Sequence, residues 1–212
     1  MTASRIALVS NLVFVGLLAT LHVIKSDVDP SWHFISDYAN GQRGWIMQVA
    51  FLCLAVSNLS TWMSVRDCLR SAVGKTGSVL FLVGTLGLVV AAIFVSDPVN
   101  TPVEAQTTSG KLHNVGGGLG ILGFVGTLLL SFRLLRYEAW RPQRRAVWIA
   151  TGILIAGFLF SFLTIAKLAT EHKGVFSPDT PVGWPNRVGI LCGCVWLAVI
   201  SWKAQTLPKT QA

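Results

Sequence analysis

Four ionisable side chains that are common in catalytic and metal sites lie at or just beyond the ends of long apolar segments: His22, Asp37, Asp97 and His113. Two imidazoles and two carboxylates can complete a tetrahedral zinc shell. If one carboxylate stays outside the shell, the open position would hold a reactive water. With Ser36 as a further catalytic candidate, one hypothesis is a metal-dependent hydrolase that acts on an ester or amide at the outer membrane surface. The sequence contains no H-E-x-x-H motif that would fix a metal.

Two other hypotheses use overlapping residues. His22 and His113 lie on different apolar segments and would ligate a b-type haem from two helices. The leading hypothesis involves no reaction: an outward-facing polar pocket binds a lipid or small amphiphile, and Lys167 and Arg187 hold its anionic group. Whether the protein is an enzyme, and whether it has a cofactor, stay open. The expected ligand contacts are His22, His33, Lys167, Asn186 and Arg187.

Each of these residues also has a purely structural interpretation. Charged side chains within a turn of a helix end can extend into lipid headgroups, which would account for Lys167 and Arg187. Asp97 comes directly before a proline and could simply end a helix, while Ser36 and Asp37 could cap a short one. The functional interpretation therefore depends on whether these distant residues meet in one place.

The composition is that of an integral membrane protein. Of the 212 residues, 52% are hydrophobic and only 12% are charged, about half the charge of a typical soluble domain. The net charge of +8 would suit a nucleic-acid-binding protein. We exclude that partner, because the basic residues lie in short stretches between apolar segments, and expect membrane lipid as the partner instead.

Six apolar segments are long enough to cross the hydrocarbon core of a bilayer as helices, since each has about 20 residues. The chain should therefore form a single all-α domain over residues 1–212, a polytopic bundle of six transmembrane helices. The predicted spans are Ile6–Ile24, Gly44–Val65, Thr76–Ser96, His113–Phe132, Ala146–Ala166 and Arg187–Gln205.

The basic residues predict the orientation of the bundle. Most of the 17 Lys and Arg residues lie on one side of the predicted spans, and by the positive-inside rule that side is cytoplasmic. Both termini should then be cytoplasmic. The residues of this set are Arg5, Arg66, Arg70, Lys75, Arg133, Arg136, Arg141, Arg144, Arg145, Lys203 and Lys209.

The three connections on the opposite side are long and mix acids, Trp, Pro and Gly: Ser26–Arg43, Asp97–Leu112 and Thr170–Asn186. Irregular loops on one face of a rigid bundle are where binding and catalytic residues concentrate. We therefore expect the candidate residues to converge in a pocket beneath these loops.

Glycines at helical spacing predict close contacts between the spans. Small residues at intervals of three and four let helix backbones approach each other in lipid. The rows are Gly84 and Gly87 in the third span, Gly116, Gly120 and Gly123 in the fourth, and Gly189 and Gly193 in the sixth.

The segment Ile35-Ser36-Asp37-Tyr38-Ala39, followed by Gly44-Trp45-Ile46-Met47, resembles the membrane proteins of domain-of-unknown-function family 998 (DUF998). The similarity covers nearly the whole chain. Members of that family are bacterial and archaeal six-helix proteins with no assigned activity, so the resemblance implies this architecture and a multi-pass location in the plasma membrane of a prokaryote. It draws attention to Ser36, Asp37, Asp97 and His113.

Overall fold

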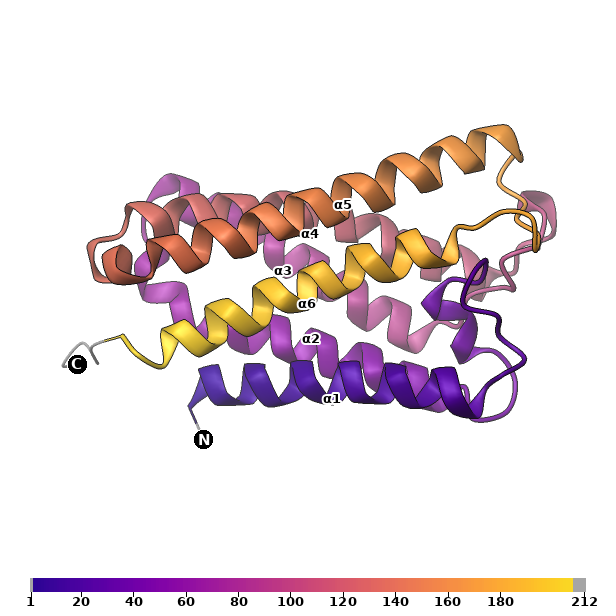
Figure 1. Cartoon of the computed structure of the whole chain (residues 1–212), viewed down its shortest axis with the longest axis horizontal. Helices are drawn as coiled ribbons and strands as arrows, with labels where there is room; N and C mark the ends of the chain where they lie inside the picture. The colour runs from indigo at the N-terminus through magenta and orange to yellow at the C-terminus, as the bar shows by residue number, and fades with distance from the viewer. Residues whose placement is uncertain (1, 208–212) are drawn as a thin grey trace.

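The computed structural model describes residues 2–207, so Lys209, counted above among the cytoplasmic residues, lies outside the described part. Six α-helices, each long and apolar enough to cross a membrane, run side by side in an elongated bundle (Figure 1). They are α1 (Ala3–Ile24), α2 (Trp45–Val65), α3 (Ala72–Ile93), α4 (Thr108–Arg136), α5 (Arg144–Glu171) and α6 (Gly183–Ala204). The described residues contain no β-strand, and the predicted all-α bundle is confirmed.

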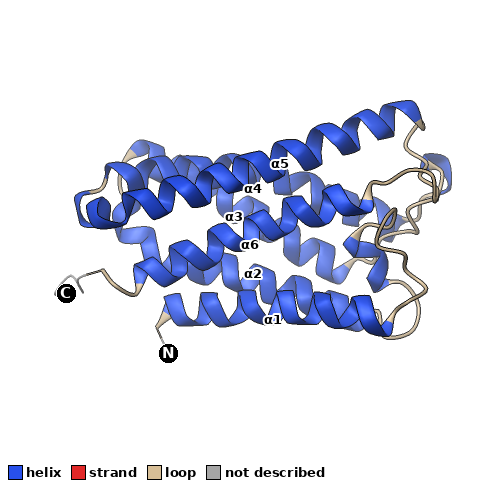
Figure 2. Cartoon of the chain, in the orientation of Figure 1, coloured by secondary structure: helices blue, strands red, loops and turns tan. Residues whose placement is uncertain are grey.

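The connections differ between the two ends of the bundle (Figure 2). At one end the short 3₁₀ helices η2 (Arg66–Leu69) and η4 (Glu138–Gln143) join neighbouring helices, and the start of α1 and the end of α6 lie there too. The other end, which we call the long-loop end, carries the irregular connections 25–44, 94–107 and 172–182. The first of these contains the 3₁₀ helix η1 (Ile35–Ala39) and the second contains η3 (Val103–Ala105).

Helix boundaries differ from the hydropathy prediction where capping side chains begin a helix within polar sequence. Ser71 and Thr107 accept hydrogen bonds from backbone N–H groups three residues on, and α3 and α4 begin directly after them. His113 consequently lies inside α4 rather than at its first residue. Arg187 lies inside α6, which begins at Gly183 without a side-chain cap. α3 ends before Ser96, which lies in the loop that follows.

α3 and α4 form the most extensive helix pair, and glycines make their approach possible. A side chain at Gly84 would overlap the backbone of Gly123, and a side chain at Gly87 would overlap the backbone of Gly116. The packing prediction is confirmed for these four residues. It is wrong for Gly120, where an added Cβ would meet nothing within 4 Å.

The pair formed by α5 and α6 shows the same contrast. Gly189 packs so closely against Ser161 that a side chain would overlap it, as predicted, whereas a Cβ added at Gly193 would meet nothing within 4 Å. Gly120 and Gly193 therefore leave open space beside their helices instead of closing a helix contact.

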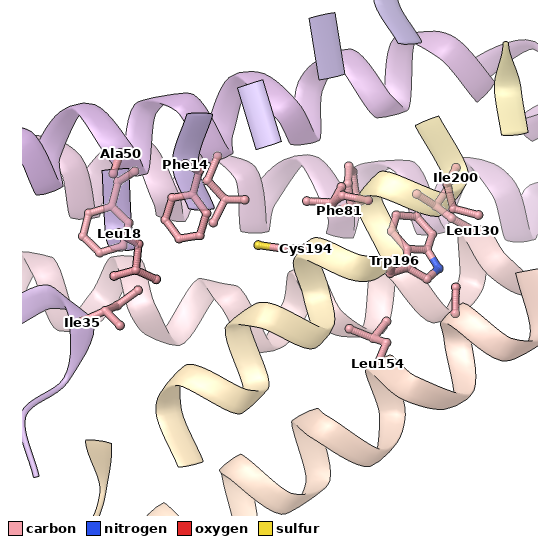
Figure 3. Close-up of a cluster of buried hydrophobic side chains, with 14 of the residues drawn as sticks. Phe14, Leu18, Ile35, Ala50, Phe81, Leu130, Leu154, Cys194, Trp196 and Ile200 are labelled. Carbon is pink, nitrogen blue, oxygen red and sulfur yellow. The ribbon is translucent and has the colours of Figure 1, made fainter. Parts of the chain in front are cut away.

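Apolar side chains from all six helices fill the interior of the bundle (Figure 3). Some buried polar groups within this core are paired across helices. The Trp196 indole N–H donates to Ser131 Oγ at 2.9 Å, and the Asn11 amide donates to the Cys194 carbonyl at 2.9 Å. Bonds of this kind replace water as partners of polar groups in a membrane, and they fix the helices that carry the long-loop end.

Candidate functional site

Arg187 is a buried cation that ties the first long loop to the bundle. Its side chain is 3% exposed. Its Nε donates to His22 Nε2 at 2.8 Å, and its Nη1 donates to the carbonyls of His33 at 2.7 Å and Gly183 at 3.1 Å. Its Nη2 donates to the Tyr38 hydroxyl at 3.3 Å. The guanidinium thus joins α1, α6 and the loop that contains η1.

Two further polar side chains hold the same loop. Lys25 is 4% exposed, and its ammonium group donates to the backbone carbonyls of Asn40 and Gln42. Asn186 accepts a hydrogen bond from the backbone N–H of Ile35 at 3.1 Å. We call Lys25, Asn186 and Arg187 the loop clamp, because their hydrogen bonds go to loop backbone or to neighbouring side chains.

The contacts of His22 define its tautomer. Its Nδ1 lies 2.7 Å from the Leu18 carbonyl and must donate to it, while its Nε2 accepts from Arg187. Both ring nitrogens therefore already have partners within the protein. A metal or haem iron at His22 would have to displace Arg187 from Nε2.

The second long loop is fastened to the start of α4 by Asp97 and His113. Asp97 accepts hydrogen bonds from the Thr107 backbone N–H at 2.7 Å and from the Thr107 hydroxyl at 2.8 Å. His113 is 8% exposed, and its Nδ1 lies 2.8 Å from the Phe94 carbonyl. These contacts set the path of the loop between α3 and α4.

A polar cavity of about 190 Å³ lies among the three long loops and the first turns of α4. Both of its charged lining residues, Asp37 and Asp97, are carboxylates, and no Lys, Arg or His lies among its lining residues. Two aromatic rings on its wall, Phe34 and Phe176, meet edge to face at a centroid distance of 5.6 Å. The cavity thus combines a negative surface with an apolar one.

Asp37 is the more deeply buried of the two carboxylates, with 3% exposure. It accepts a hydrogen bond from the Phe34 backbone N–H at 3.2 Å. Burial raises the pKa of the Asp37 carboxyl to about 7, although backbone N–H groups and the nearby charge of Arg187 act in the opposite direction. Asp37 therefore exchanges a proton near neutral pH.

Ser96 also lines the cavity, and its hydroxyl lacks a partner. The residue is 8% exposed, and its Oγ forms no hydrogen bond with any residue that the structure describes. A buried hydroxyl without a partner costs free energy unless something else supplies the bond. The Ser96 hydroxyl is thus a buried group on the cavity lining whose hydrogen-bonding capacity the described residues leave unused.

The structure brings together only part of the predicted site. Ser36, Asp37 and Asp97 line the polar cavity, but His22 and His113 do not. Across residues 2–207, no group of three or more His, Cys, Asp or Glu side chains is arranged to hold a metal ion. The four proposed metal ligands are therefore separated. His22 contacts the loop clamp, Asp37 and Asp97 line the cavity, and His113 fastens the α3–α4 connection.

The predicted ligand contacts are distributed in a similar way. Arg187 and Asn186 lie in the loop clamp, and His33 contributes its backbone carbonyl there rather than its ring. Burial is the main cause that lowers the pKa of the His33 imidazole. Lys167 has a 74% exposed side chain, and its Nζ lies 3.9 Å from Glu171 Oε1. Neither of the two predicted cations, Lys167 and Arg187, lines the cavity.

Two residues of this region escaped the sequence analysis. Lys25 looked like an ordinary basic residue at a helix end, because nothing in the sequence reveals that loop carbonyls surround it. Ser96 lay at the predicted end of the third span, and its position next to Asp97 was the one available signal.

Comparison with known proteins identifies a family but no characterised relative. The family model described as "Protein of unknown function (DUF998)" matches residues 8–203, which is nearly the whole chain. No curated protein and no solved structure matches.

Proposed function

Because the chain belongs to the DUF998 family, whose description assigns no activity, we propose a function from the geometry of the polar cavity: it binds the cationic head group of a small amphiphile. The observation that carries this proposal is the pairing of a buried carboxylate, Asp37, with a buried hydroxyl that lacks a partner, Ser96, on a cavity wall without basic residues.

The electrostatics of the cavity favour a cation over the anion expected from the sequence. Carboxylates that line a concave, partly desolvated surface concentrate positive ligands. The nearby cations Lys25 and Arg187 direct their donors at loop carbonyls and neighbouring side chains, so they are not available to an anionic head group. Asp37 and Asp97 are thus the charges that a ligand in the cavity meets.

The apolar part of the wall favours an amphiphile over a simple ion. Phe34 and Phe176 present aromatic surface, and Val99 extends the same apolar cluster. Aromatic faces attract ammonium groups as well as hydrocarbon. A ligand with an ammonium group at Asp37 and a short apolar portion against these rings would satisfy both kinds of surface.

Binding of small amphiphiles that differ only in charge tests this function. The probes are hexyltrimethylammonium and hexanoate, measured by calorimetry on the protein in nanodiscs of zwitterionic lipid, with empty nanodiscs as the blank. We expect saturable binding of the ammonium probe at least about tenfold tighter than that of hexanoate, as a charge-assisted contact provides. Equal affinities for the two probes would remove the proposal.

Asp37→Asn supplies the matched variant, and Asp179→Asn supplies the control. The first substitution removes a cavity carboxylate, and the second removes an exposed carboxylate that does not line the cavity. Affinity for hexyltrimethylammonium should fall about tenfold only in the first. In the unmodified protein, the affinity for the ammonium probe should also rise with pH as Asp37 ionises around pH 7. The charged groups that neighbour Asp37 are Asp97 and Arg187.

We also propose that the long-loop end faces the outside of a prokaryotic plasma membrane and that both termini are cytoplasmic. The positive-inside rule supports this orientation. Single cysteines introduced at the exposed positions Asp27 and Arg141, in a background without the native cysteines, provide the test. A membrane-impermeant thiol reagent added to intact cells should label position 27 and leave position 141 unlabelled.

The hydrolase and haem hypotheses stay predictions. The histidine that both of them require, His22, already has partners at both ring nitrogens. The haem hypothesis uses neither of the cavity carboxylates, and neither hypothesis gives the Ser96 hydroxyl a role. Elemental analysis for zinc and an absorbance spectrum for a Soret band test them directly.

A further inference from the structure

A second cavity lies deep in the bundle, separate from the polar cavity, and shares no lining residue with it. Its volume is about 180 Å³, and its walls come from α2, α3, α4, α5 and α6. Leu54, Gly120 and Gly193 each lie near the middle of their helices, so the cavity is at mid-depth of the predicted spans. Most of its wall is apolar, including Phe81, Leu154 and Ile190.

The polar atoms on this wall are largely committed to the protein. The Trp196 N–H donates to Ser131, and the Thr127 hydroxyl donates to the Gly123 carbonyl. Asn58 adds a half-buried amide on α2. Such a wall offers few of the two to four polar partners that a water molecule needs in a cavity.

Two glycines keep the cavity open. Gly120 of α4 and Gly193 of α6 both line it, and a Cβ added at either position would meet nothing within 4 Å. Gly120 is also exposed, so the cavity reaches the lipid-facing surface of the bundle there. Other lining glycines, such as Gly84 and Gly123, are packed against each other where α3 and α4 meet.

The molecules that surround the opening of the cavity at Gly120 determine which ligand can enter it. Closed apolar cavities of about 150 Å³ in soluble proteins stay dry and take up small apolar molecules. At mid-depth of a bilayer the only abundant molecules are hydrocarbon chains. We propose that this cavity, which we call the chain cavity, binds a single hydrocarbon chain that enters from the bilayer at Gly120. This inference does not depend on the function proposed for the polar cavity.

Photocrosslinking in membranes tests the chain cavity directly. The probes are a palmitic acid with a mid-chain diazirine and an isoprenol with a diazirine, which distinguish a linear from a branched chain. After irradiation of the reconstituted full-length protein, mass spectrometry locates the adducts. Labelling of Leu154, Ile190 or Trp196 by either probe supports the site. If neither probe labels these residues, or if adducts spread evenly over lipid-facing residues, the proposal is overturned.

Variants that fill the cavity provide the second arm. Gly120→Leu and Gly193→Leu each place a side chain in the open space of the cavity. Both also replace a helical glycine with a better helix former. Gly118→Leu and Gly152→Leu are controls, since they also lie beside open space but do not line it.

Labelling of the cavity wall should fall about tenfold in the doubly filled variant and stay unchanged in the controls. Circular dichroism and gel filtration check that each variant folds. If the double variant fails to fold, the single Gly193→Val variant replaces it, and the wild-type adduct map decides the question on its own. Unchanged wall labelling in a folded, filled variant would contradict the proposal.

Discussion

The loop clamp and the polar cavity both lie at the long-loop end, and both contain a buried charged residue. They differ in whether the protein itself satisfies that charge. In the clamp, Arg187 is 3% exposed and donates to three carbonyl or hydroxyl oxygens and one imidazole nitrogen. In the cavity, Asp37 is equally buried, but open space of about 190 Å³ lies before it. One charge is satisfied by the protein, and the other faces a space that a ligand can fill.

This difference separates structural from functional residues better than burial or charge alone. His22, Asn186 and Arg187 have the residue types of a binding site, yet their hydrogen bonds hold a loop in place. Ser96 has the least distinctive side chain of the region, but its hydroxyl is buried without a partner on the cavity wall. Functional candidates here are those whose bonding capacity the protein leaves unused.

Loss of the guanidinium should have the largest effect on stability. Arg187→Leu leaves the His33 carbonyl, the Tyr38 hydroxyl and the His22 Nε2 without their donor. We expect roughly 3 kcal/mol of destabilisation from these lost bonds, measured as the shift in thermal unfolding in mild detergent. Lys167→Met removes an exposed cation and should change stability by less than about 0.5 kcal/mol. Equal effects of the two substitutions would show that the clamp does not hold the loop.

Asp37→Asn should change how stability depends on pH. The folded-state pKa of Asp37 is raised, so the folded chain binds more protons than the unfolded chain between pH 3.8 and about pH 7. The stability that Asp37 contributes is therefore complete below this window and is lost as pH rises through it.

Relative to Asp37→Asn, the unmodified protein should lose on the order of 2 kcal/mol between pH 5 and pH 7. Thermal unfolding of both proteins across this range measures the difference, and Asp179→Asn serves as the control. Parallel pH profiles for the unmodified protein and Asp37→Asn would mean that Asp37 is not buried as described.

Asp97 has two kinds of contact, since it lines the polar cavity and fastens the α3–α4 loop. Asp97→Ala removes the two hydrogen bonds to Thr107, so we expect about 1 kcal/mol of destabilisation. Affinity for hexyltrimethylammonium should fall as well, because the cavity loses a carboxylate. Thermal unfolding and calorimetry on the same preparation measure the two effects. A loss of stability with unchanged affinity would assign Asp97 to the loop alone.

Ser96→Ala should have the smallest effect on stability and still weaken binding. Its Oγ has no partner to lose, so stability should change by less than about 0.5 kcal/mol, in either direction. Affinity for hexylammonium, whose N–H groups can donate to the Ser96 Oγ, should fall by about threefold, as the loss of one modest hydrogen bond predicts. A large drop in stability without any drop in affinity would place the Ser96 hydroxyl in the fold rather than in the binding site.

The architecture followed from the sequence because it depends on local patterns. Apolar runs set the six spans, and the spacing of Gly84 and Gly123 within two of them anticipated the closest helix contact. Helix limits were less accurate, because Ser71 and Thr107 begin α3 and α4 by capping and not by hydropathy. Gly120 was misjudged, since spacing along one helix does not reveal which glycines have a facing partner.

The site was only partly predictable, for a related reason. Asp37 and Asp97 were identified from their residue type and their place at helix ends, and they do share a cavity. The role of Arg187 depends on the backbone carbonyls of His33 in the first long loop and Gly183 in α6, which have no signature in the sequence. Hydrogen bonds to backbone groups far away in the sequence therefore determine which charged side chains can still contact a ligand.

The most direct test is an experimental map of the protein with hexyltrimethylammonium bound. We predict density for the ammonium group within ion-pairing range of the Asp37 carboxylate and next to Ser96, with the alkyl chain along Phe34 and Phe176. A polar cavity that contains no added density at saturating ligand would contradict the account. So would a head group bound instead at the loop clamp.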